Sequence, residues 1–175
     1  MSSLFSHVFI PLAILFIFSE KLKLNKKNIL ILSFFSILPD TDAYVFIHRA
    51  SVHNIFILII PILMFVILKN KEISGVAAFY LISHIILDIF NGGVYVLYPL
   101  YDNVFFLRAE LLFNDGNMMS VIYYGIRDEI VPIRIGEPVI SSENVGTMIL
   151  LTIISLLSVI RYMSNIKSVK GLQKV

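Results

Sequence analysis

The chain has 175 residues, enough for one domain, a net charge of +2 and no cysteine. Hydrophobic residues make up 58% of the sequence and charged residues 15%, whereas soluble domains are roughly 45–50% apolar and about 25% charged. This composition excludes an ordinary soluble domain, and the missing cysteine excludes disulfides and thiolate metal sites. Since the mean hydropathy is +0.88, we expect residues 1–175 to form a single integral membrane domain with the lipid bilayer as its partner. No nucleic-acid partner is expected.

Apolar runs recur along the whole chain and predict an all-α membrane protein with about five transmembrane helices. Each run is shorter than the roughly 20 residues that usually span a bilayer, so we expect polar ends to extend the helices while lysines snorkel outward. The second run is the shortest, and a re-entrant segment is the alternative for it. The runs cover residues 4–18, 29–38, 55–68, 75–90 and 145–160.

The lysines predict how these helices are oriented. Every lysine falls within residues 19–28, 69–74 or 161–175, and basic residues concentrate on the cytoplasmic side of membrane proteins. The sequence therefore predicts a cell-membrane protein with its N-terminus outside and its C-terminus in the cytoplasm. Residues 39–53 and 91–144 are then expected to face outward.

The longest connection, residues 94–144, joins the fourth and fifth predicted helices. Its apolar pieces are interrupted by charged residues such as Asp102, Arg108 and Glu110, so we expect no further span there. We interpret it as a partly extended outer cap that lies in part on the membrane surface. Residues 131–138 are expected to be extended, with turns at Gly136 and Pro138.

Histidines and aspartates fall at one depth in this topology, near the outer interface. His84 and Asp88 are four residues apart and share a helix face, while Pro39 ends its helix and lets the next two aspartates turn inward. A single histidine here is equally well explained as a hydrogen-bonded helix contact. Together, however, ionisable groups at membrane depth indicate a functional site. The predicted metal ligands are His7, Asp40, Asp42, His48, His53, His84 and Asp88.

Three blocks within residues 4–101 resemble a known family. They are the early His7, the runs LPDTD at 38–42 and HRASVH at 48–53, and the run SHIILD at 83–88 followed by NGG at 91–93 and LYP at 97–99. This combination resembles the YdjM-like family of membrane-bound metal-dependent hydrolases. Many relatives carry hydroxyl residues where Asn54 and Asn91 stand here.

A fainter similarity is to zinc-dependent phospholipases C and related nucleases. It implies that one of the two aspartates after Pro39, three histidines and one further aspartate bind zinc. Those enzymes use further histidines later in the chain, whereas this sequence has no histidine after His84. We therefore expect one or two ions rather than three. The implied ligands are His7, Asp40 or Asp42, His53, His84 and Asp88.

The leading functional hypothesis is hydrolysis with a divalent metal, zinc being favoured for mixed imidazole and carboxylate ligands. Asp40 or Asp42 is the candidate general base, and Arg49 is a candidate electrophile or lipid-phosphate contact, with interfacial anchoring as the alternative. The depth of the site favours a lipid-like or other amphiphilic small substrate, such as an ester or phosphoester. The alternatives are a divalent metal or proton transporter and a non-catalytic scaffold with a structural metal.

Overall fold

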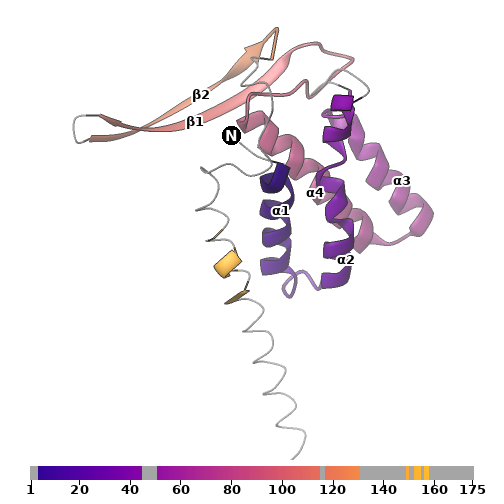
Figure 1. The fold of residues 1–175 in the computed structure, drawn as a ribbon. Helices are drawn as coiled ribbons and strands as arrows, with labels where there is room; N and C mark the ends of the chain where they lie inside the picture. Colours follow the sequence, from indigo (N-terminus) through magenta and orange to yellow (C-terminus); the bar gives the residue numbers. More distant parts are fainter. Residues whose placement is uncertain are drawn as a thin grey trace, which may run out of the picture.

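The computed structural model describes residues 4–44, 51–114, 117–130, 149, 152–154 and 156–157. Helices lie side by side in a bundle, and a long hairpin projects from one end of it (Figure 1). The helical elements are α1 (Leu4–Phe18), α2 (Lys26–Ile31), η1 (Leu32–Ser36), η2 (Pro39–Tyr44), η3 (Ile55–Leu58), α3 (Ile59–Leu68) and α4 (Lys71–Phe90), and the strands are β1 (Val104–Asn114) and β2 (Asn117–Arg127).

Asparagines set where the helices begin. The Asn25 side chain accepts a hydrogen bond from the backbone N–H of Lys27 and so caps α2. Asn70 caps α4 in the same way, accepting from Glu72 and Ile73. Lys69, with φ of 51°, ends α3 in the left-handed conformation, so the polar link between α3 and α4 forms a tight helical turn.

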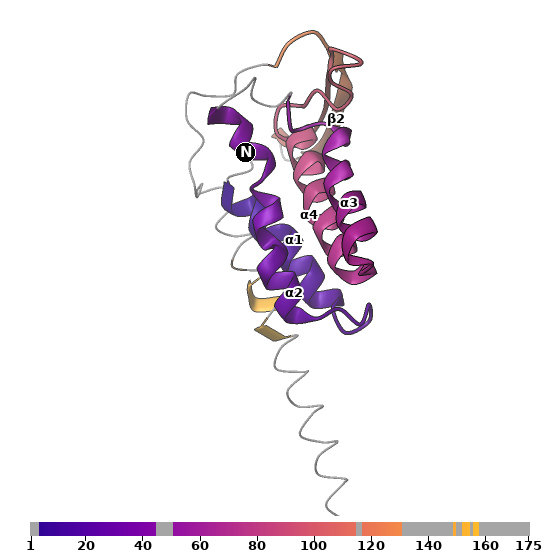
Figure 2. The same ribbon diagram turned by 90° about the vertical axis from the view of Figure 1, so that its right-hand side faces the viewer.

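Helix α4 lies in the middle of the bundle and contacts α1, η1 and α3 (Figure 2). Its inward face buries Ala77, Tyr80 and Leu81 completely. The Tyr80 hydroxyl donates a 2.8 Å hydrogen bond to the carbonyl of Ile29, which ties α4 to α2. In contrast, α3 exposes large apolar side chains along its length, among them Ile62, Val66 and Ile67, as expected of a surface that faces lipid.

The predicted apolar segments correspond to helices where the structure describes them. α4 is the one helix among the described residues that is long and apolar enough to cross a membrane, while Phe5–Phe18 and Ile55–Leu68 are shorter apolar helices. Most of residues 145–160 lie outside the described part. The count of about five crossings, the re-entrant alternative and the orientation of the termini therefore stay predictions.

Residues 94–144, which were predicted to form an outer cap, contain a β-hairpin that the prediction of an all-α protein missed. β1 and β2 pair antiparallel from Val104↔Arg127 to Asn114↔Asn117. Arg108, one of the charged residues that argued against a further span, lies on one of the two alternating faces of β1. The expectation of partly extended structure is thus correct for residues 104–114 and 117–127, whereas residues 131–138 lie outside the described residues.

Candidate metal centre

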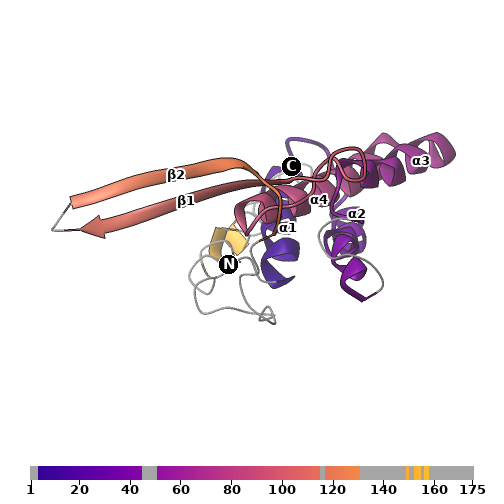
Figure 3. The same ribbon diagram turned by 90° about the horizontal axis from the view of Figure 1, so that it is seen from above.

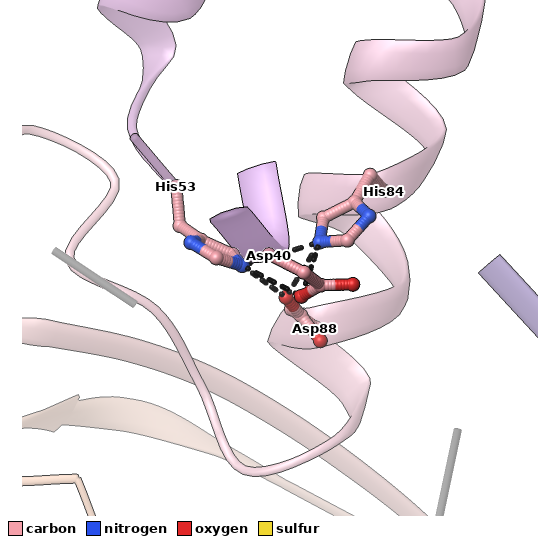
Figure 4. Close-up of side chains that lie close together, drawn as sticks. All are labelled: Asp40, His53, His84 and Asp88. Carbon is pink, nitrogen blue, oxygen red and sulfur yellow. Dashed lines mark hydrogen bonds and ion pairs between the residues drawn. The ribbon is translucent and has the colours of Figure 1, made fainter. Parts of the chain in front are cut away.

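Four acidic and imidazole side chains meet at the end of the bundle from which the hairpin emerges (Figure 4). Asp40 comes from η2, His53 from the segment before η3, and His84 and Asp88 from successive turns of α4. One ligand atom of each lies within 4.8 Å of all the others. The buried cluster could therefore hold a metal ion, with donors from three separate segments of the chain.

The spacing of the donor atoms fits a tetrahedral ion. The Nε2 atoms of His53 and His84 are 3.2 Å apart. Oδ2 of Asp88 lies 3.3 Å from the first and 3.2 Å from the second, and Oδ1 of Asp40 lies 3.3 and 3.4 Å from them. An ion with tetrahedral bonds of about 2.0–2.1 Å holds its ligand atoms about 3.3–3.4 Å apart. Five of the six edges of such a tetrahedron thus have the expected length, and the sixth joins the two carboxylate groups, whose ligand atoms lie within 4.8 Å of each other.

His84 has its coordinating nitrogen selected by a backbone group. Its Nδ1 lies 2.6 Å from the carbonyl oxygen of Ser36, and a carbonyl can only accept, so Nδ1 carries the proton. In the neutral ring, Nε2 then presents a lone pair toward Asp40 and Asp88. A lone pair facing two carboxylate oxygens is unfavourable unless a proton or a cation lies between them. Metal-binding histidines are commonly oriented through their second nitrogen in this way.

Capping asparagines hold the segments that carry the other donors. Asn54 follows His53, caps η3 by accepting from Phe56 N–H, and donates to the Ser51 carbonyl. Asn91 is the C-cap of α4, and its backbone N–H donates to the Asp88 carbonyl. These two asparagines thus border candidate ligands and fix local backbone geometry.

His7 packs against the cluster from α1. Its Nε2 lies 3.3 Å from Oδ1 of Asp88, the oxygen that does not face the other two imidazoles. Its ring stacks on His84 with the centroids 4.2 Å apart. His7 Nδ1 is buried and has no hydrogen-bond partner among the described residues. His7 therefore orients Asp88. Its Nε2 could also bind an ion that is held by Oδ1 of Asp88.

Asp40 is the most solvent-exposed of the four residues in the cluster. Its side chain is 25% exposed, against 0% for both His53 and His84 and 2% for Asp88. Burial raises the pKa of the Asp40 carboxyl, but hydrogen bonds from the Nε2 atoms of His53 and His84, when these carry protons, outweigh burial and hold the pKa below its ordinary range. Asp40 is therefore an ionised carboxylate that solvent can reach.

The structure brings together four of the seven predicted ligands and places His7 beside them. Asp42 lies in η2, but its side chain, like His48 and Arg49, lies outside the described residues. The Ser36 carbonyl was missed by sequence reasoning. A backbone acceptor leaves no mark in residue identity, although the short helix ending near Pro39 was a signal that free carbonyls lie there.

The fold and the cluster together define a largely helical protein with a membrane-crossing candidate helix and a possible metal centre. A family model described as YdjM inner membrane protein matches residues 1–167. The chain belongs to this family, which places it in a cell membrane. Comparisons with curated proteins and with solved structures find no match.

Proposed function

We propose that this protein is a metal-dependent hydrolase of the cell membrane, with zinc as the favoured ion. The observation that carries the proposal is that two imidazole nitrogens lie 3.2–3.4 Å from each other and from two carboxylate oxygens. Zinc accepts this mixed donor set in tetrahedral geometry, and softer thiolate ligands are absent from the sequence. One ion is expected, held by His53, His84 and Asp88 with Asp40 beside it. A second would need His7, Oδ1 of Asp88 and donors beyond those described.

The residues of the cluster divide into a fixed part and an accessible part. His53, His84 and Asp88 are buried and held by neighbouring backbone hydrogen bonds, so they would keep an ion in place. A zinc ion bound there would lower the pKa of a coordinated water toward about 7 and polarise a carbonyl or phosphoryl oxygen. Asp40, ionised and partly exposed, is placed to accept the proton of an attacking water.

The location of the cluster supports an amphiphilic substrate. It lies at the C-terminal end of α4, the helix long enough to span a bilayer, where the hairpin leaves the bundle. With the N-terminus outside, as the lysines predict, this end is at the outer membrane surface. A lipid-like ester or phosphoester can present its polar group at that depth. Residues 94–144 would then form an extracytoplasmic cap over one integral membrane domain.

A structural metal is the second candidate, and one observation favours it. Four protein donors fill a tetrahedron, and structural zinc sites are closed in this way, whereas catalytic sites keep an open position. The two functions differ in what Asp40 does. A structural site needs Asp40 as a permanent ligand, while a hydrolase needs it to be released to water or to act as a base.

The test combines metal analysis with turnover in purified, detergent-solubilised protein. Wild type should contain zinc and cleave a member of a panel of lipid esters and phosphoesters in mixed micelles, and chelation should abolish cleavage reversibly. Asp40→Asn should reduce kcat at least about 100-fold with metal content nearly intact. Asp102→Asn, a neutralised exposed carboxylate in the cap, is the matched control and should leave both unchanged.

Two outcomes would contradict the proposal. Loss of metal in Asp40→Asn, together with no turnover by wild type on any substrate, would assign the site a structural role. Movement of divalent ions or protons across liposomes that depends on His84, again without turnover, would make the protein a transporter instead.

A further inference from the structure

The hairpin of β1 and β2 extends sideways from the bundle. In Figure 1 it leaves one end of the bundle and runs to one side, across the direction of the helices, and Figure 3 shows it from above as it extends away from the bundle. Each strand has 11 residues, which corresponds to a ribbon roughly 35 Å long. A two-stranded hairpin of this kind is marginal in water by itself and needs a surface to rest on.

The register sorts the side chains of the ribbon into two unlike faces. Residues directly opposite each other share a face, and the pairs on one face are Phe105↔Ile126, Leu107↔Tyr124 and Ala109↔Ile122. This face carries no charge at those positions. Its β2 residues are strongly exposed: Ile122 at 62%, Tyr124 at 80% and Ile126 at 53%.

The other face of the ribbon carries two arginines and holds the ribbon to the bundle. It contains the pairs Val104↔Arg127, Phe106↔Gly125 and Arg108↔Tyr123. We call the end of the ribbon next to the bundle, around Val104 and Arg127, its root. There Arg127 donates from Nη2 to the carbonyl of Gly92, and its Cζ lies 4.8 Å from the centroid of the Phe106 ring. The direction in which the ribbon leaves the bundle is therefore fixed by contacts at its base.

A second set of contacts reinforces the root. Val94 forms an antiparallel bridge with Phe105 through two backbone hydrogen bonds. Gly93, with φ of +91°, fits this approach because a Cβ there would lie 2.6 Å from Val104 Cγ1 and 2.8 Å from the Phe105 carbonyl. These contacts fix the root of the ribbon. Two-stranded ribbons twist along their length, so the two faces of the outer half are rotated relative to those at the root.

We propose that the hairpin is an interfacial arm whose uncharged face rests in the bilayer, at the boundary between headgroups and acyl chains. The chain belongs to an inner membrane protein family, so a bilayer surrounds the helices from which the ribbon projects. A ribbon that runs across the direction of those helices, at the end of the candidate span α4, can lie along the membrane surface. Tyrosines such as Tyr124 favour this boundary, and Arg108 on the other face suits the headgroup side.

The proposal rests on membrane location and the geometry of the hairpin, and it does not depend on the proposed hydrolysis. A second copy of the chain is the other surface that could cover the uncharged face. The two occupants differ in what surrounds Tyr124: acyl chains and headgroups in one case, protein in the other.

The absence of tryptophan from the chain gives a direct test. Tyr124→Trp and Tyr123→Trp place a single fluorophore on opposite faces of β2, and Tyr123 is the matched control at 48% exposure. Full-length protein is reconstituted in phosphatidylcholine and phosphatidylglycerol vesicles, with and without lipids brominated on the acyl chains. Trp at 124 should emit at shorter wavelength and be quenched at least about threefold more strongly than Trp at 123.

Several results would overturn the interfacial arm. Equal, weak quenching at both positions with water-like emission would mean that the ribbon stands free of the bilayer. A blue-shifted Trp at 124 that resists bromolipid quenching and becomes water-like when the protein is diluted in the membrane would identify a second copy as the occupant. A far-UV circular dichroism spectrum and a size-exclusion profile that match wild type serve as the check that each variant is folded.

Discussion

Replacing His84 by alanine tests the candidate metal centre most directly. It removes the imidazole whose Nε2 lies 3.2 Å from both His53 Nε2 and Asp88 Oδ2. It also removes the hydrogen bond from Nδ1 to the Ser36 carbonyl. The substitution thus has a metal-linked effect and a metal-independent effect on the free energy of unfolding, and a chelator separates them.

The expected magnitudes follow from these contacts. An ion present at 100 times its dissociation constant stabilises the folded state by about 2.7 kcal/mol. For a chain of this size that corresponds to roughly 5–10 °C in the unfolding temperature. Without metal, loss of the buried hydrogen bond and of packing should still cost about 1–3 kcal/mol. His84→Ala should therefore unfold earlier than wild type in chelator, and zinc should no longer raise its unfolding temperature.

The assay is thermal unfolding of the detergent-solubilised protein, followed with excess chelator and again with added zinc, alongside metal analysis. Ile86→Ala, on the exposed side of α4, is the control and should keep the full zinc-dependent shift. If His84→Ala bound zinc as wild type does and showed the same shift, the cluster would not be the metal site and the tetrahedral interpretation would be wrong.

Three further predictions concern the bundle, the donors and the topology. Tyr80→Phe removes the buried hydrogen bond to Ile29 and should lower the free energy of unfolding by about 1–2 kcal/mol in chemical denaturation, without altering metal content. Zinc should dissociate as the pH falls below about 6, because protons compete for the imidazole donors, and equilibrium dialysis across pH measures this. Cysteine introduced at Ser142 should react with an impermeant thiol reagent in intact cells, whereas cysteine at Asn70 should react only after permeabilisation.

The donor set could be predicted from residue types because such groups are rare and costly at membrane depth. Spacing placed His84 and Asp88 on one helix face, and the structure has both oriented toward one point. Sequence could not choose between Asp40 and Asp42, since the choice depends on how η2 turns after Pro39. Nor could it show that the Ser36 carbonyl fixes the His84 ring, because that contact joins residues 48 apart in the chain.

The helices were predictable where apolar runs end in polar residues. The run 55–68 coincides with η3 and α3, and the run 4–18 with α1. The hairpin was not predicted because its two strands do not both alternate between apolar and polar residues. Leu107, Arg108 and Ala109 alternate in β1, but Val121, Ile122 and Tyr123 follow one another in β2 without a charged residue between them. Only the pairing between the strands reveals that one face is uncharged.

The chain between α4 and β1 links the metal centre to the hairpin, and this link leads to a last prediction. Gly93 N–H donates to the Asp88 carbonyl, and the Gly92 carbonyl accepts from Arg127. Arg127→Gln should loosen the end of α4 that carries Asp88 and weaken zinc affinity by about tenfold, the lower limit for groups that orient metal ligands. Competition with a chromogenic chelator measures this affinity. Arg108→Gln, an exposed arginine on the same face, is the control and should leave it unchanged. Equal affinities in wild type and Arg127→Gln would show that the hairpin root and the metal centre are independent.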